Sequence, residues 1–284
     1  MRRTILLVVV LTACGKKTTA PAKEDPPPVP VPVATADAPA PTPTPAPDAV
    51  AAAVAPTVST PVPTDARLLI TSVTANWDAV PTELTEWRRD AGKPWTKVRS
   101  WTGVVGHTGL AWGKGLHGNG PPEGREGPMK LEGDGKAPAG VFTLDGSYGY
   151  GKAPPANAGL PYQQVDKSWH CVDDASSQSY NKIVDADTVT VDWKSSEDMK
   201  RKDWLYTWVI QVGHNPERLP GEGSCIFLHV WRSATDGTVG CTAMPQTDIE
   251  TLLSDLDPKD HPTLVQLTAD EYKALATTWE LPAR

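Results

Sequence analysis

Short runs of apolar and β-branched residues recur between residues 67 and 231 and predict a chain built mainly from strands. The run at 67–73 has the character of a buried strand. Further strands are predicted at 98–105, 140–144, 188–193, 204–212 and 224–231. Three segments are predicted to be helical: 81–91, with a proline at its start and Gly92 just past its end, 248–256 and 270–277. We therefore expect a mainly β fold with a few flanking helices.

Two details refine this pattern. Thr268 stands where an N-cap is expected for the last helix, and Glu271 follows three residues later. Residues 106–135 contain too many glycines and prolines for regular elements, and irregular stretches of this length in a compact domain are often functional.

The N-terminus carries Arg2 and Arg3 ahead of a short apolar run at 5–11, which predicts a signal peptide over residues 1–13 rather than a spanning helix. Residues 11–15, Leu-Thr-Ala-Cys-Gly, resemble a bacterial lipobox, in which Cys14 receives lipid. An ordinary cleavage site beside an unrelated cysteine is the alternative. Gly15 in place of aspartate favours an outer-membrane destination over the inner membrane.

Residues 14–65 are dominated by proline, alanine, threonine and valine, a composition that cannot bury enough apolar surface to form a core. We interpret this segment as a disordered tether. It would let a lipid-anchored domain leave the membrane surface and remain in the cell envelope or periplasm.

Residues 66–284 have the length of one domain. Residues 1–65 contain five basic and five acidic residues, so the formal net charge of −7 belongs to this domain. The negative balance disfavours nucleic acid as a partner. Asp134, Asp173 and Asp174 lack the spacing of a metal site, and we expect no cofactor. The oligomeric state is left open.

The segment Thr238-Val239-Gly240-Cys241 contains a candidate nucleophile, the thiol of Cys241. Gly240 allows a tight turn that frees amide groups, and a helix predicted from Pro245 onwards would favour a thiolate on Cys241. His229 lies on the strand before this turn and could meet the thiol. Spacing alone is weak evidence, because a buried cysteine near an unrelated core histidine gives the same pattern.

Residues 223–229 together with 238–241 resemble the active-site signature of L,D-transpeptidase catalytic domains, the cysteine transpeptidases of bacterial peptidoglycan. Matches to the same family extend through 133–142, 173–181 and 213–216. The resemblance implies a β-sandwich catalytic domain. The sequence departs from the family at Val239, where many members have histidine, and at Ala243, where many have arginine.

The resemblance also implies roles for individual residues. His229 would deprotonate Cys241, the backbone carbonyl of Val230 would orient the imidazole, and amides around Gly240 would hold the oxyanion. Substrate contacts would come from His214, Thr238, Val239 and Arg232, although His214 could instead bond its own turn.

The partner implied by the family is the peptidoglycan stem peptide, which would form a thioester with Cys241 and then pass to an amine acceptor. Transfer of the acyl group to water, as in a carboxypeptidase, is an alternative, and so is a non-catalytic wall-binding lipoprotein. Cys171 and Cys225 could form a disulfide in an oxidising compartment or remain two buried thiols.

Overall fold

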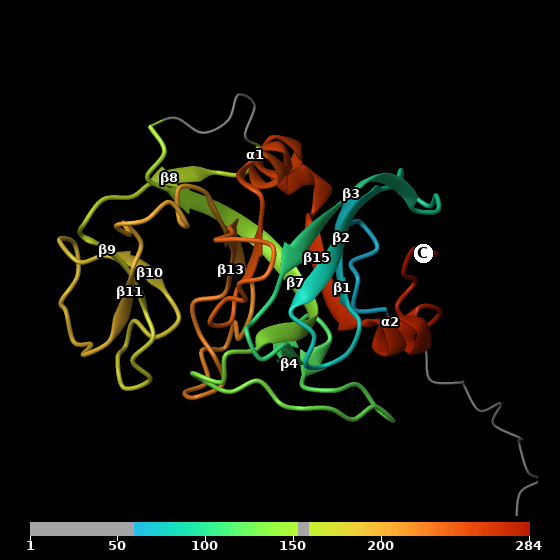
Figure 1. Cartoon of the computed structure of the whole chain (residues 1–284), viewed down its shortest axis with the longest axis horizontal. Coiled ribbons are helices and arrows are strands. Elements are labelled where there is room, and N and C mark those ends of the chain that lie inside the picture. The colour runs from blue at the N-terminus through green and yellow to red at the C-terminus, as the bar shows by residue number, and fades with distance from the viewer. Residues whose placement is uncertain (1–59, 153–158) are drawn as a thin grey trace, which may run out of the picture. The chain divides into compact units, whose positions relative to one another are not determined.

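The computed structural model describes residues 60–152 and 159–284 (Figure 1). The predicted signal peptide, the lipobox with Cys14 and most of the predicted tether lie outside these residues. The packed chain begins before Ala66, because Val62 is buried and the Thr60 hydroxyl donates to the carbonyl of Trp279 at 2.8 Å. Across the described ranges, no helix has the length and apolar character needed to cross a membrane.

The fold is mainly β, as predicted. The strands are β1 (Leu68–Thr74), β2 (Pro81–Arg88), β3 (Thr96–Val104), β4 (Leu110–Trp112), β5 (Lys114–Gly115), β6 (Gly118–Asn119), β7 (Ala137–Gly149), β8 (Tyr162–Gln164), β9 (Trp169–Val172), β10 (Ile183–Asp185), β11 (Ser196–Asp198), β12 (Val209–Val212), β13 (Phe227–Val230), β14 (Thr242–Met244) and β15 (Thr263–Thr268). The helices are α1 (Gln246–Asp255), α2 (Ala269–Leu275) and a single 3-10 turn at Pro258–Asp260.

The main sheet runs in the order β12-β13-β14-β3-β2-β1-β15-β7-β4, and β12 also pairs with β7. This last pairing closes the path, so eight strands form a barrel-like ring. The mainly β part of the expected fold is thus confirmed, whereas a division into two packed sheets is not. A separate sheet of β10-β9-β11 lies on the opposite side of the main sheet from α2 in Figure 1.

Strand β1 is buried on both faces, which explains its continuous apolar sequence. Leu68 and Ile70 pack into a core with α1, while Leu69 and Val73 pack into a second core with α2. Because side chains alternate across a strand, one strand supplies both cores. A third cluster of buried residues includes Met199, Val209 and Phe227 together with the candidate nucleophile Cys241.

The helix predicted at 81–91 is wrong, because residues 81–88 form β2, which pairs with both β1 and β3. The burial of Glu86 explains why a sequence with helix-favouring residues forms a central strand. Its carboxylate is fully buried and accepts hydrogen bonds from Arg88 at 3.2 Å and Arg99 at 3.0 Å. Tertiary pairing of this kind overrides the local preference.

The strand predicted at 188–193 is also wrong. Val189 and Val191 are exposed, and Asp192 instead accepts hydrogen bonds from the Ser177 hydroxyl and from the Gln178 amide. The strand predicted at 204–212 is limited to β12, and the one at 224–231 to β13. Residues 106–135 contain the three short strands β4 to β6 and are otherwise irregular.

Candidate active site

Cys241 immediately precedes β14 and is buried, with 2% of its surface exposed. Among the described residues it is the one cysteine outside a disulfide. Its thiol donates to the backbone carbonyl of Cys225 at 3.5 Å. The sulfur is therefore held as a neutral hydrogen-bond donor.

The environment of Cys241 does not favour a thiolate. Burial raises the pKa of the thiol, and the negative charge of Glu197 raises it further, while the nearby Phe227 amide and Tyr206 side chain act in the opposite direction. The predicted helix does not start beside Cys241, because β14 separates the cysteine from α1. The expected stabilisation of a thiolate by a helix N-terminus is therefore wrong.

His229 lies on β13, in register with Ala243 of β14 and Val209 of β12. Its Nδ1 lies 2.8 Å from the carbonyl oxygen of Val230. Since a carbonyl can only accept, Nδ1 carries the hydrogen and the lone pair remains on Nε2. Burial lowers the pKa of His229 to about 4, although the bond to Val230 acts in the opposite direction.

His229 and Cys241 line one cavity of about 160 Å³. The parallel pairing of β13 with β14 brings them to the same place, because Leu228 is in register with Thr242. The cavity is also lined by Arg201, Leu205, Tyr206, Arg232, Asp236, Gly237, Thr238, Val239 and Ala243. The structure thus gathers His229 and Cys241 with Thr238, Val239 and Arg232.

The turn before Cys241 is held by Thr238. Its hydroxyl donates to the carbonyl of Cys241 at 2.6 Å and accepts from the Gly240 amide at 3.1 Å. Gly240 has a φ of 157°, which favours glycine. Its amide already has a partner, so an oxyanion at this turn would have to share that donor.

Two arginines lie in the cavity lining. Arg201 makes a bidentate pair with Asp203 at 2.9 Å for both bonds, whereas Arg232 lies 3.7 Å from the same carboxylate and its side chain is 54% exposed. Arg232 is thus the less constrained of the two. Val239 is 69% exposed at the cavity lining.

His214 does not line this cavity, contrary to our expectation. It is 3% exposed, its Nε2 faces the carbonyl of Glu222 at 3.1 Å, and its Nδ1 accepts from the Lys114 amide at 3.3 Å. Burial lowers its pKa to about 3. The ring of His214 is therefore held by backbone groups. This agrees with the alternative that we gave for this residue, a histidine with a structural role in its own turn.

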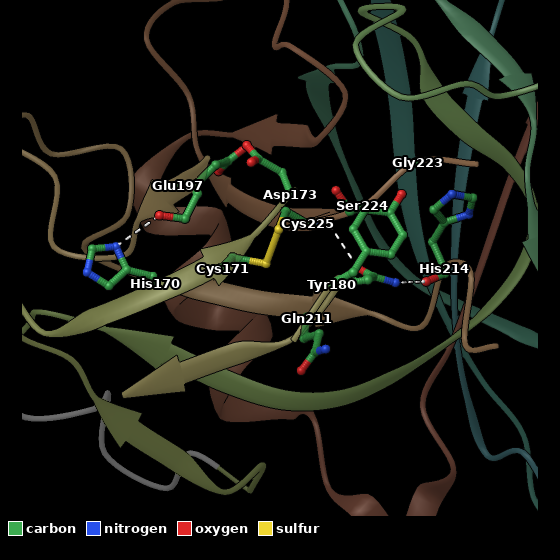
Figure 2. The surroundings of a disulfide bond; sticks show 12 residues. His170, Cys171, Asp173, Tyr180, Glu197, Gln211, His214, Gly223, Ser224 and Cys225 are labelled. Atoms are coloured by element: carbon green, nitrogen blue, oxygen red, sulfur yellow. Dashed lines mark hydrogen bonds between the residues drawn. A yellow bond between two sulfur atoms is a disulfide. The ribbon is translucent and has the colours of Figure 1, made fainter. Parts of the chain in front are cut away.

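Cys171 of β9 and Cys225 form a disulfide (Figure 2). Asn181 holds the same region: its side-chain oxygen accepts from the Cys225 amide, and its amino group donates to the carbonyls of His214 and Asn215, each at 3.0 Å. The backbone carbonyl of Cys225 accepts the hydrogen bond from the Cys241 thiol. Cys225 itself is fixed by the disulfide and by the hydrogen bond from its amide to Asn181.

A second cavity, of about 150 Å³, also reaches Cys241. Its lining includes Lys130, Glu132, Asp173, Glu197 and Ser224, but not His229. In Figure 2, Asp173 and Glu197 lie near the disulfide. Cys241 therefore lines two cavities of different character.

Sequence reasoning missed Tyr206 and Glu197. The Tyr206 ring lies edge-on to the His229 ring at 5.1 Å between centroids, and its hydroxyl donates to Glu197 at 2.5 Å. Burial raises the pKa of both groups. Residues 196–203 carry no apolar pattern, and the strand predicted at 204–212 did not indicate that Tyr206 would lie beside Cys241.

Over residues 60–152 and 159–284, no group of three or more histidine, cysteine or acidic side chains is placed to hold a metal ion. Comparison with protein-family models, with curated proteins and with solved structures gave no match.

Proposed function

We propose that the C-terminal domain is a peptidoglycan L,D-transpeptidase in which Cys241 forms a thioester with a stem peptide. The observation that carries this proposal is the presence of Cys241 and His229 in one cavity, with the imidazole oriented by the carbonyl of Val230. The family resemblance implies this same set of residues. An L,D-transpeptidase-like fold is part of the proposal.

The neutral thiol transfers its proton to Nε2 of His229 as sulfur attacks the amide carbonyl of the stem peptide. The C–S bond forms, and the C–N bond to the terminal D-amino acid breaks. The protonated imidazole then gives its proton to the leaving amine. A thioester and a neutral His229 remain, ready for an amine acceptor.

The pKa directions at the site suit this sequence of events. A buried neutral thiol beside a neutral imidazole needs no preformed ion pair, and proton transfer accompanies attack. A non-catalytic wall-binding protein would have no need for an imidazole held with its lone pair in a cavity shared with a thiol.

Hydrolysis of the thioester by water shares every step up to the thioester, so a carboxypeptidase is the second candidate.

The cell-envelope location and a lipid anchor at Cys14 rest on the N-terminal motif and belong to the proposal as well. Replacing Cys14 with alanine should release the protein from membranes but leave the chemistry intact.

Incubation of the domain with tetrapeptide stems and an amine acceptor, followed by mass spectrometry, tests the proposal. We expect cross-linked product from the wild type and none from Cys241→Ser, whose hydroxyl is a much weaker nucleophile at neutral pH. A carbapenem should add its mass to the wild type at Cys241. Wild-type turnover by Cys241→Ser, or an adduct elsewhere, would exclude the cysteine mechanism.

A further inference from the structure

Glu197 is a second titratable group at one of the cavities that Cys241 lines. It lines the second cavity together with Cys241, whereas His229 lines the first. The shared lining brings the carboxylate near the sulfur, and its negative charge raises the pKa of the Cys241 thiol. A nucleophile that enters through the second cavity would therefore meet a carboxylate near the thioester and no imidazole in that lining.

The second cavity has a negative balance, because its lining holds three carboxylates and one ammonium. Lys130 is buried and paired with Asp134 at 2.6 Å. Glu132 accepts from Tyr180 at 2.7 Å and from Ser224 at 2.8 Å. These contacts fix the charges in place and favour the entry of a cationic amine.

Glu197 has one carboxylate oxygen available. Its Oε2 accepts from Tyr206, while Oε1 has no hydrogen-bond partner among the described residues and is not one of their buried unpartnered atoms. Oε1 is thus not fully buried. Proton acceptance there would not require the bond to Tyr206 to break.

We propose that Glu197 is the general base of the second half-reaction, accepting a proton from the amine that attacks the Cys241 thioester through the second cavity. This inference rests on the proposed function. The amine enters as a cation and first releases one proton to solvent, and its neutral nitrogen then attacks the thioester carbonyl so that a C–N bond forms. Glu197 takes a proton from nitrogen, the C–S bond breaks, and the proton then passes to the departing sulfur. The amide product, the neutral thiol and the ionised carboxylate are the result.

The two steps can be measured separately. Release of the D-amino acid reports thioester formation, and appearance of the cross-linked peptide reports its transfer. Rapid quenching of the wild type and of Glu197→Gln, with a tetrapeptide stem and a diamino-acid acceptor, yields both rates. Glutamine keeps an oxygen for the Tyr206 hydroxyl but cannot accept a proton.

In Glu197→Gln we expect a burst of D-amino acid close to one equivalent, followed by transfer slowed about 100-fold, with acyl-enzyme visible by mass. Asp198→Asn is the matched control. It removes the neighbouring carboxylate on β11, which is 75% exposed and lines neither cavity, and it should behave as wild type.

Transfer at the wild-type rate in Glu197→Gln would overturn the role of Glu197. So would an equal loss of both steps, or an equally slow transfer step in Tyr206→Phe, because Glu197 would then act only through the packing of Tyr206. The proposed function fails on a different result: a wild type in which a carbapenem leaves no adduct on Cys241.

Discussion

At the residue scale, Cys241 and His229 are both uncharged at neutral pH, because burial raises the pKa of the thiol and lowers that of the imidazole to about 4. Chemistry at this pair therefore depends on proton transfer during attack. A reagent that attacks only a preformed thiolate should react slowly with Cys241, whereas a substrate whose attack is assisted by His229 should react readily.

Cys241 should react more slowly with iodoacetamide at pH 7 in the folded domain than in the same domain unfolded in urea. Iodoacetamide attacks the thiolate, and burial keeps the sulfur protonated. Mass spectrometry of quenched time points measures both rates. Alkylation of the folded protein as fast as, or faster than, the unfolded chain would show that the thiol is ionised despite its burial.

Acylation by a carbapenem should persist well below the ordinary pKa of histidine. The reaction needs neutral His229, which exists above its folded-state pKa of about 4 and is lost as the pH falls through that value. We expect the acylation rate to have an acid limb near pH 4. Circular dichroism at each pH controls for unfolding, and a limb near pH 6.5 in folded protein would contradict this assignment.

At the element scale, features that depend on neighbouring residues were predicted correctly, whereas a strand that depends on partners distant in sequence was missed. The N-cap of α2 is confirmed, since the Thr268 hydroxyl accepts from the Glu271 amide at 3.2 Å. Capping involves residues close in sequence and can therefore be predicted. Strand β2 could not, because its buried Glu86 is satisfied by Arg99 from the next strand.

The same distinction applies to the site. His229 and Cys241 stand close in sequence within a recognisable motif, and the parallel pairing of β13 with β14 brings them into one cavity. Tyr206 and Glu197 come from a segment without a matching motif. The place of Glu197 depends on the pairing of β11 with β9, and Tyr206 is held there through its bond to Glu197, which no local pattern reveals.

The disulfide joins Cys171 on β9 to Cys225, 54 residues later in the sequence, and the Cys225 carbonyl accepts the hydrogen bond from the Cys241 thiol. Loss of this tie frees the unfolded chain, so Cys171→Ala with Cys225→Ala should lower the free energy of unfolding by about 2–4 kcal/mol. Urea denaturation measures the change, with Cys241→Ala as a control that keeps the bond. An unchanged midpoint in the double variant would show that the bond contributes nothing to stability.

At the scale of the whole molecule, buried histidines link folding to pH. His214 and His229 are 3% and 5% exposed, and burial lowers their pKa values to about 3 and about 4 from an ordinary 6.5. On acidification the unfolded chain therefore takes up protons before the folded chain does. The stability they contribute is complete above pH 6.5 and is lost as the pH falls towards the folded-state values.

Between pH 7.5 and pH 5, each of these two histidines should reduce the free energy of unfolding by ~2 kcal/mol. Urea denaturation of the domain across this range, which lies above the ordinary pKa values of carboxylates, measures the slope. His229→Gln removes one titrating group and should flatten the slope, whereas His261→Asn, at a side chain that is 54% exposed, should leave it unchanged. If His229→Gln kept the full wild-type slope, the loss of stability in acid would have to arise from groups other than the imidazole beside Cys241.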